Sequence, residues 1–365
     1  MRRRALLSLA GMTSSGSPAM AEGGSPGLWE LGRPRGLIFG TAVRGDRLEA
    51  DPALAALVVS QAELLVPEWE GKWDVIQPER NRFNFGPLRT VLRFGQANGK
   101  RVRGHALIWH EAMPAWLPSA LAADPSQAQQ LMEAHFSSVL GETRAAIRDW
   151  DVVNEVISAP PGGDNPSPTD GDLRPTPWLT ALGPGYVELA FRIARRLDPT
   201  LRLTMNEFGL YSDTPWAQIK RERMLRVVRG LLDRNCPLDA IGIQGHLQMR
   251  EPFRPEPYVR FVTELRSMGL AVLITEMDVR EPDVLAPTLA ERDDAVAEYA
   301  GAFLDASREG GARTFLVWGL ADRDSWLVTE PGVARRDGQL TRGHPYDAEL
   351  RPKPLRARLA RFLSS

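Results

Sequence analysis

Short runs of apolar residues recur along the chain, and each is followed by polar residues and then by a helical pattern. Eight such runs occupy residues 36–43, 62–68, 101–109, 149–155, 201–207, 240–246, 271–278 and 313–320. Strands that helices cover on both faces are continuously apolar, so these runs indicate a parallel sheet. Eight strand–helix repeats are the number that closes a barrel, and we therefore predict a single (β/α)8 TIM barrel of the α/β class.

The segments between the runs predict the outer helices. Residues 86–100 place Leu88, Val91 and Leu92 on one face, as an amphipathic helix does, and residues 186–199 have a similar pattern. An open, doubly wound sheet is the alternative arrangement of such repeats. The first run is not followed by the glycine-rich turn that binds dinucleotides in that fold, which favours the barrel.

The first 35 residues differ in composition from the rest of the chain. Residues 1–21 contain an arginine cluster, a short apolar segment and an Ala-x-Ala site at 19–21. This pattern predicts an export signal of the twin-arginine type, and the alternative is a basic tail with a chance Ala-x-Ala. Residues 22–35 predict a flexible linker and residues 36–365 the barrel domain. We therefore expect a protein that is exported, to the periplasm or outside the cell.

Charge and hydropathy limit the partners. Lys and Arg number 45 against 46 Asp and Glu, so the basic excess that nucleic-acid binding needs is missing. No segment beyond the N-terminus approaches the roughly 18 apolar residues of a membrane span. The single cysteine, Cys236, cannot form an internal disulfide, and we expect it to be a buried apolar side chain. A neutral polymer or a small molecule fits this composition better.

The strand ends carry the candidate chemistry, because the active site of such a barrel lies at the carboxyl ends of its strands. An indole packs on the C–H face of a sugar, while carboxylates and amides supply the acceptors and donors that its hydroxyls need. The ends of the runs therefore predict a carbohydrate site. The residues found there are Glu68, Trp109, His110, Asn154, Glu155, Asn206, Glu207, Gln244, His246, Glu276, Asp278 and Trp318.

Two of these carboxyl groups suit glycoside hydrolysis, which needs one protonated and one ionised carboxyl group. Glu155 ends the run "WDVVNE" and Glu276 lies in "VLITEMDV", at the ends of the fourth and seventh predicted strands. Their side chains can therefore meet in one site. His246 is placed to hydrogen-bond Glu276, with Asp278 holding the imidazole in turn.

The order of these motifs resembles glycoside hydrolase family ten, the endo-1,4-β-xylanases, over about residues 36–354. The resemblance implies a retaining endo-1,4-β-xylanase that cuts internal bonds of xylan or xylooligosaccharides by double displacement. It implies no cofactor and no metal, and we expect a monomer. The motifs are "GHALIWH" (104–110), "WDVVNE" (150–155), "IGIQGH" (241–246), "ITEMDVR" (274–280), "VWGLADRDSW" (317–326) and "RPKP" (351–354).

The same resemblance implies a role for each matching residue. Glu155 would be the acid/base and Glu276 the nucleophile, while Asn154 would bind the 2-hydroxyl of the sugar being cleaved. The support of His246 by Asp278 is expected from the residues themselves, as stated above. The other residues expected to bind substrate or to support Glu276 are Glu68, Lys72, His105, Trp109, Gln244, His246, Trp318 and Trp326.

The chain departs from the family pattern in three places. Trp69 stands where the family usually has Asn, and Phe208 stands where a tyrosine is usual. The segment 158–178 is long and rich in Pro, Gly and Asp, and we expect it to affect the far side of the cleft. An alternative function is therefore that of a related β-glycosidase with a narrowed cleft, acting on short oligosaccharides, aryl β-glycosides or another plant β-glycan.

Two other classes of protein fit the sequence less well. A metal-dependent hydrolase of this fold would use clustered histidines, and the five present form neither H-x-H nor H-E-x-x-H. A noncatalytic sugar-binding barrel would lack one of the two carboxylates. For single residues, a surface ion pair is the alternative for Lys72, capping of a turn for Asn206 and Glu207, and core packing is expected for Trp73.

Overall fold

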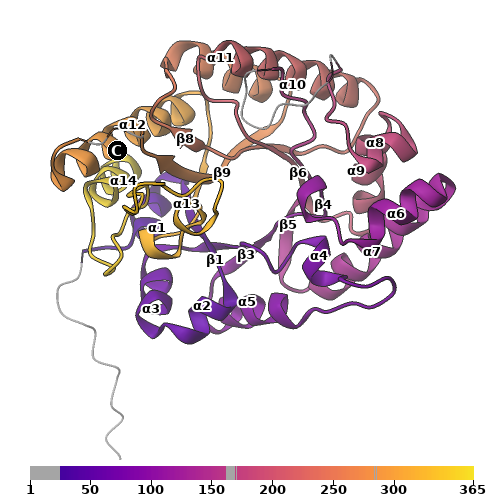
Figure 1. Cartoon of the computed structure of the whole chain (residues 1–365), viewed down its shortest axis with the longest axis horizontal. Coiled ribbons are helices and arrows are strands. Elements are labelled where there is room, and N and C mark those ends of the chain that lie inside the picture. Colours follow the sequence, from indigo (N-terminus) through magenta and orange to yellow (C-terminus); the bar gives the residue numbers. More distant parts are fainter. Residues whose placement is uncertain (1–24, 162–168, 170, 283, 285) are drawn as a thin grey trace, which may run out of the picture.

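The computed structural model describes residues 25–365 except 162–168, 170, 283 and 285 (Figure 1). Within this part of the chain, parallel strands pair around a ring in the order β1, β2, β3, β5, β6, β7, β9 and β10. β10 pairs with both β9 and β1, which closes the ring. The predicted (β/α)8 barrel is confirmed, whereas the export signal predicted over 1–21 lies outside the described residues.

The strands agree with the eight apolar runs, except that two runs are divided. The run at 101–109 gives β3 and β4, and the run at 240–246 gives β7 and the start of β8. β4 pairs with the end of β5 and β8 with the end of β9, so both lengthen the barrel wall at its carboxyl end. The strands are β1 (Ile38–Val43), β2 (Leu64–Pro67), β3 (Arg101–Gly104), β4 (Ile108–Trp109), β5 (Ile147–Asn154), β6 (Arg202–Glu207), β7 (Ala240–Ile243), β8 (His246–Gln248), β9 (Ala271–Arg280) and β10 (Thr314–Val317).

Helices surround the barrel (Figure 1). The helices predicted over 86–100 and 186–199 are present as α5 and α9, each ending two or three residues earlier than predicted. The helices are α1 (Leu28–Gly32), α2 (Gly45–Ala50), α3 (Pro52–Gln61), α4 (Trp73–Ile76), α5 (Gly86–Ala97), α6 (Trp116–Ala123), α7 (Ala128–Thr143), α8 (Pro177–Leu182), α9 (Tyr186–Leu197), α10 (Pro215–Asp233), α11 (Pro255–Ser267), α12 (Leu289–Glu309), α13 (Trp326–Thr329) and α14 (Pro354–Ser364).

The barrel interior contains a buried ion pair below the site. Arg103 of β3 donates two hydrogen bonds to the carboxylate of Asp151 of β5, each 2.5 Å long, and both side chains are buried. Burial opposes ionisation of Asp151, but the charge of Arg103 outweighs it and lowers the pKa of the carboxyl group. A buried charge is tolerated when its partner satisfies it in this way. The pair joins two neighbouring strands just beneath their functional ends.

Part of the predicted N-terminal linker is helical in the structure. Residues 28–32 form α1, residues 33–35 continue it as a 3₁₀ turn, and Leu28 is fully buried. α1 packs against α14, so the start of the described chain lies beside its end. The prediction of a flexible linker over 22–35 is therefore wrong for residues 28–35. The reason is that Leu28 and Leu31 pack on the core although the surrounding composition is rich in Gly and Pro.

Candidate active site

The two predicted carboxyl groups line one pocket at the carboxyl end of the barrel. Glu155 directly follows β5 and Glu276 lies in β9, and the pocket has a volume of about 490 Å³. The twelve residues expected to catalyse, to bind substrate or to support Glu276 all line this pocket. They are Glu68, Lys72, His105, Trp109, Asn154, Glu155, Gln244, His246, Glu276, Asp278, Trp318 and Trp326.

Glu276 is buried among donors. Asn206 Nδ2 donates to its Oε1 at 2.5 Å, His246 Nε2 lies 3.2 Å from Oε2, and His105 Nδ1 lies 3.9 Å from Oε1. Burial opposes its ionisation, but the charge of His105 and the hydrogen bond from His246 outweigh it and lower the pKa of Glu276. The carboxylate is thus kept charged, as a nucleophile must be.

His246 lies between two carboxylates, as the sequence predicts. Its Nδ1 is 3.0 Å from Asp278 Oδ1, and Asp278 Oδ2 accepts a 2.6 Å hydrogen bond from Trp326 Nε1. Burial lowers the pKa of His246, but Asp278 and Glu276 outweigh it and raise that pKa to about 10. The ring is therefore an imidazolium at neutral pH, and both nitrogens donate.

Glu155 has a different environment, made of amides. Its Oε1 accepts hydrogen bonds from Gln244 Nε2 at 3.0 Å and from Asn154 Nδ2 at 3.2 Å. Asn206 Nδ2 donates to Asn154 Oδ1 at 2.8 Å as well as to Glu276, so a chain of amides joins the two carboxyl groups. The backbone of Glu155 is left-handed, with φ of 58°, which is uncommon for a residue other than glycine.

Asn206 is the site residue that the sequence analysis missed. Its position at the end of a strand also fits the capping of a turn, which is the alternative given above. In the structure Thr275 Oγ1 donates to Asn206 Oδ1 at 2.7 Å, which fixes the amide with its nitrogen toward Glu276. The available signal was its register, because Asn206 pairs with Asn154 on the neighbouring strand and so faces the same way.

Glu207, by contrast, has a structural role rather than a place in the pocket, as its alternative interpretation expects. Its carboxylate accepts hydrogen bonds from the backbone N–H of Ile157 at 2.8 Å and of Phe208 at 3.1 Å. It also pairs with the buried Lys220 at 2.8 Å. Lys220 Nζ lies 3.3 Å from the ring centroid of Phe208, a residue that lines the pocket. Lys220 of this buried pair therefore packs against the ring of Phe208 and holds it in place.

The β2 side of the pocket contains a buried lysine. Lys72 Nζ lies 4.0 Å from the ring centroid of Trp69 and 4.5 Å from that of Trp109, and its side chain is buried. The alternative of a surface ion pair for Lys72 is therefore wrong. Burial lowers the pKa of Lys72 and raises that of Glu68 to about 7. Trp69 is 42% exposed and offers a flat apolar face to the pocket.

Indoles and histidines form the remaining walls. Trp318 packs edge-on against His105, with ring centroids 5.3 Å apart, and against His246 at 6.2 Å. Trp109 Nε1 is buried and has no hydrogen-bond partner among the described residues. Trp73 is buried in the core, as expected.

The long segment 158–178 does not contribute to the pocket through any of its described residues. An antiparallel bridge joins Ile157, the residue before this segment, to Leu173 within it. The effect predicted for this segment on the far side of the cleft concerns residues 162–168 and 170 as well, which lie outside the described part of the chain.

One group of described residues has the composition of a cation site. A ligand atom from each of His110, Glu111 and Glu155 lies within 4.8 Å of the others. A cation held there would occupy Glu155 itself and compete with its proton.

None of the helices in the described residues is long and apolar enough to cross a membrane.

A barrel pocket that holds two carboxyl groups in different environments, lined with indoles and amides, defines a glycoside hydrolase. The family model of glycosyl hydrolase family 10 matches residues 27–361. The chain therefore belongs to glycoside hydrolase family 10, and it is an enzyme of that class.

Individual relatives agree with this assignment. The chain is 32% identical over 297 residues to a β-1,4-xylanase of Dictyoglomus thermophilum, covering 79% of this chain and 78% of that protein. It is 30% identical over 307 residues to endo-1,4-β-xylanase A of Fusarium oxysporum f. sp. lycopersici, covering 80% and 87%.

Solved structures have the same fold. Xylanase 10B from Thermotoga petrophila, in complex with xylobiose, superposes with a TM-score of 0.82 and 25% identity, covering 94% of this chain and 98% of that one. Native xylanase 10B from Thermotoga maritima superposes with a TM-score of 0.80 and 26% identity, covering 92% and 98%.

Proposed function

We propose that the protein is a retaining endo-1,4-β-xylanase that hydrolyses internal β-1,4 bonds of xylan or xylooligosaccharides. The observation that carries the proposal is the pair of Glu155 and Glu276 in one pocket. Histidines hold Glu276 charged, whereas Glu155 accepts hydrogen bonds from the neutral amides of Asn154 and Gln244. The relatives named as β-1,4-xylanases support the choice of substrate.

The reaction proceeds in two displacements. Glu276 attacks the anomeric carbon, the bond to the glycosidic oxygen breaks, and Glu155 gives its proton to that oxygen as the shorter chain leaves. Water then attacks the same carbon, Glu155 takes a proton from it, and the bond to Glu276 breaks. Two inversions restore the original anomeric configuration, and both carboxyl groups return to their starting states.

The surrounding residues bind and orient the sugar. Asn154 donates to the 2-hydroxyl of the sugar being cleaved, and its position is fixed by Asn206. His105 and Trp109 border the same sugar. Glu68 and Lys72 hydrogen-bond the next sugar on the nonreducing side, while Trp318 and Trp326 stack on the rings. Because these side chains lie on a rigid barrel wall, they are placed before the substrate arrives.

The first experiment is a time course of products from xylan and from xylohexaose. An open groove gives mid-chain cuts and a mixture of short oligomers from both substrates. NMR of the first products then gives the anomeric configuration, and inversion would contradict the mechanism. Inactivity on both substrates, with activity on another β-glycan, would contradict the substrate.

The alternative of a narrowed cleft rests on Trp69. Its indole covers Lys72 at the β2 side of the pocket, in the place where the family usually has the small amide of Asn. Release of sugar from short oligomers or aryl β-glycosides, with xylan untouched, would establish this second function.

The roles of the two carboxyl groups are tested by substitution. Glu276→Ala abolishes turnover of all substrates, because no other group forms the covalent intermediate. Glu155→Ala lowers activity on xylan far more than on aryl xylosides with good leaving groups, which need little protonation. Glu349→Gln, an exposed carboxylate outside the pocket, is the control and leaves both rates unchanged. Equal losses on both substrates for Glu155→Ala would contradict its role as the acid.

The predicted export signal and the monomeric state are also proposals. Fusion of residues 1–35 to a reporter that is active only outside the cytoplasm tests export. Loss of export on replacing Arg2, Arg3 and Arg4 by lysine would assign it to the twin-arginine type. Light scattering of the purified protein tests the monomer.

A further inference from the structure

A second pocket, of about 440 Å³, adjoins the active site. It lies between the ends of β8 and β9 and the segment 332–337. Gln248, Arg280 and Val333 line both this pocket and the one that holds Glu155 and Glu276, so the two share a wall. A molecule bound in the active site can therefore extend a branch into the second pocket without leaving the first. Its volume is in the range of small-molecule sites.

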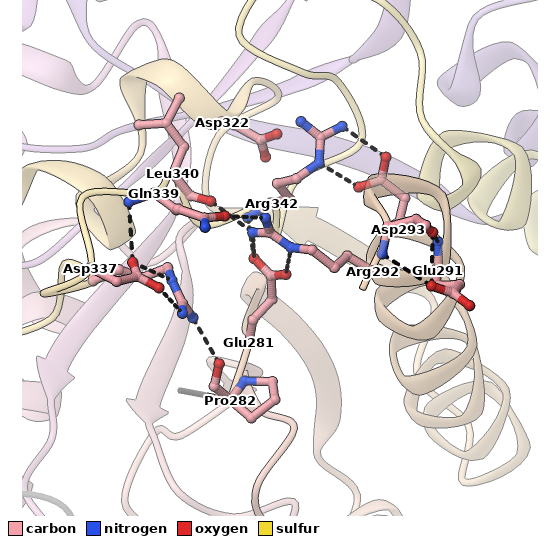
Figure 2. Close-up of polar contacts among 12 residues, drawn as sticks. Glu281, Pro282, Glu291, Arg292, Asp293, Asp322, Asp337, Gln339, Leu340 and Arg342 are labelled. Atoms are coloured by element: carbon pink, nitrogen blue, oxygen red, sulfur yellow. Dashed lines mark hydrogen bonds and ion pairs between the residues drawn. The ribbon is translucent and has the colours of Figure 1, made fainter. Parts of the chain in front are cut away.

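The second pocket is rich in arginine. Its lining includes two carboxylates, Glu281 and Asp337, and both already have cationic partners. Figure 2 shows Glu281 facing Arg292, which donates to it at 2.7 and 3.0 Å. Asp337 accepts hydrogen bonds at 2.5 and 3.1 Å from Arg335. The four arginines of the lining are Arg250, Arg280, Arg335 and Arg336.

Two of these arginines remain without a counterion. Within the described part of the chain, the side chains of Arg280 and Arg336 make no hydrogen bond and no ion pair. Arg280 is only partly exposed, so water does not solvate its charge fully. A guanidinium in such a place is stabilised by an anion, and its planar fork matches a carboxylate with two parallel hydrogen bonds.

The position of Arg280 relates this anion to the reaction. Glu276, Asp278 and Arg280 lie at alternate positions of β9, and all three line the active-site pocket. Four residues of strand place Arg280 about 13 Å beyond Glu276. An anion at Arg280 is therefore not on the sugar that is being cleaved. It belongs to a neighbouring sugar of the same chain.

We propose that the arginine pocket binds the carboxylate of a uronic-acid side group on the β-1,4-linked chain held in the active site. The inference rests on the proposed function, since it needs a polysaccharide main chain in the cleft. Arg280 and Arg336 bind the carboxylate. The branch reaches them from the main chain because the two pockets adjoin at their shared residues. The enzyme then prefers acidic, branched xylan to the unbranched polymer.

The test compares three substrates of the same backbone: a xylooligosaccharide, the same chain with one glucuronic acid branch, and the branched chain with its carboxyl group reduced to an alcohol. The reduced substrate keeps the shape of the branch and removes only its charge. The wild-type enzyme has a kcat/KM about tenfold higher for the acidic substrate than for the reduced one, because a hydrogen bond to a charged group is lost. This preference diminishes at high salt.

Variants assign the effect to the pocket. Arg336→Gln loses most of the preference for the acidic substrate and leaves kcat/KM on the unbranched chain unchanged. The single variant Arg280→Gln has a still smaller preference for the acidic substrate than Arg336→Gln. Arg336→Lys keeps the charge without the fork and loses part of the preference. Arg361→Gln, which removes the same charge from α14, is the control and changes nothing.

The outcomes separate the two proposals. If the unbranched chain is not cut at all, the proposed function fails. If it is cut, but the acidic and reduced substrates react equally, only the arginine pocket is overturned. Inorganic phosphate that stabilises the protein against heat in an Arg336-dependent manner, without any preference for the acidic substrate, would make the pocket a site for free anions and would also overturn the inference.

Discussion

At the scale of single residues, the charge of Glu276 depends on its two histidines. Burial alone would favour the neutral acid, yet its pKa is lowered because His105 and His246 lie against it. His246 in turn keeps its proton because Asp278 and Glu276 raise its pKa to about 10. Glu276 therefore stays ionised as the pH falls to 4.5, the ordinary pKa of a glutamate side chain. His246 stays protonated as the pH rises toward 10.

This arrangement predicts a shift in the pH profile. In His246→Gln, burial of Glu276 remains while the hydrogen bond and charge of His246 are lost, so the pKa of Glu276 rises. The acidic limb of kcat/KM moves from below pH 4.5 in the wild type to a higher pH in the variant. Rates on an aryl xyloside between pH 3 and pH 8 measure it. An unmoved acidic limb would show that His246 does not set the charge of Glu276.

The sequence predicted the lining of the site well because strand ends converge in any closed barrel. It missed Asn206, since its contact with Glu276 depends on which strands are neighbours. It also gave no sign of the pairing of Arg103 with Asp151. Both lie within apolar runs, and the period of such a run does not tell which charges meet inside the barrel.

At the scale of elements, the strands were predictable because both of their faces are buried. β4 and β8 were not separated from the longer runs, because two or three residues are too few to show a period. The ring of Trp150 on β5 lies directly against Gly104 of β3. A Cβ at Gly104, the last residue of β3, would lie 2.1 Å from the ring of Trp150 of β5, so only glycine fits there.

Gly104→Ala is therefore expected to lower the free energy of unfolding by about 1 to 3 kcal/mol, the usual cost of overpacking a core. Urea unfolding followed by tryptophan fluorescence measures it. The matched control is Gly141→Ala, in the last turn of α7, where nothing lies within 4 Å of the new Cβ. Because alanine has the higher helix propensity, that variant is equally stable or more stable. Similar losses in both variants would mean that Trp150 does not restrict the position.

At the scale of the whole molecule, the two ends of the described chain are held together. α1 packs against α14, and Arg356 donates to the carbonyl of Pro26. Arg35 likewise donates to the carbonyl of Ser365, at 3.1 Å. The short N-terminal helix was hidden in the sequence because it is only five residues long, which is too short for a helical period.

Leu28→Ala tests whether this contact stabilises the fold. Leu28 is fully buried, so its truncation is expected to cost about 2 to 5 kcal/mol of unfolding free energy. The control is Leu289→Ala at the start of α12, where the side chain is 58% exposed, and its effect stays within about 0.5 kcal/mol. Urea midpoints of both variants decide the matter. Equal midpoints would show that α1 contributes no stability to the barrel.

The left-handed backbone of Glu155 has a consequence for protein engineering. A residue with a Cβ in this conformation is less stable than glycine by about 1 to 2 kcal/mol. A library at this position that is selected only for survival of heating would therefore enrich glycine and asparagine. A plate assay for sugar release would discard both, since neither can donate the proton that the proposed mechanism takes from Glu155. Heat selection of this enzyme must be coupled to a screen for turnover. Otherwise, Glu155 is expected to be replaced early by a residue that tolerates the left-handed backbone.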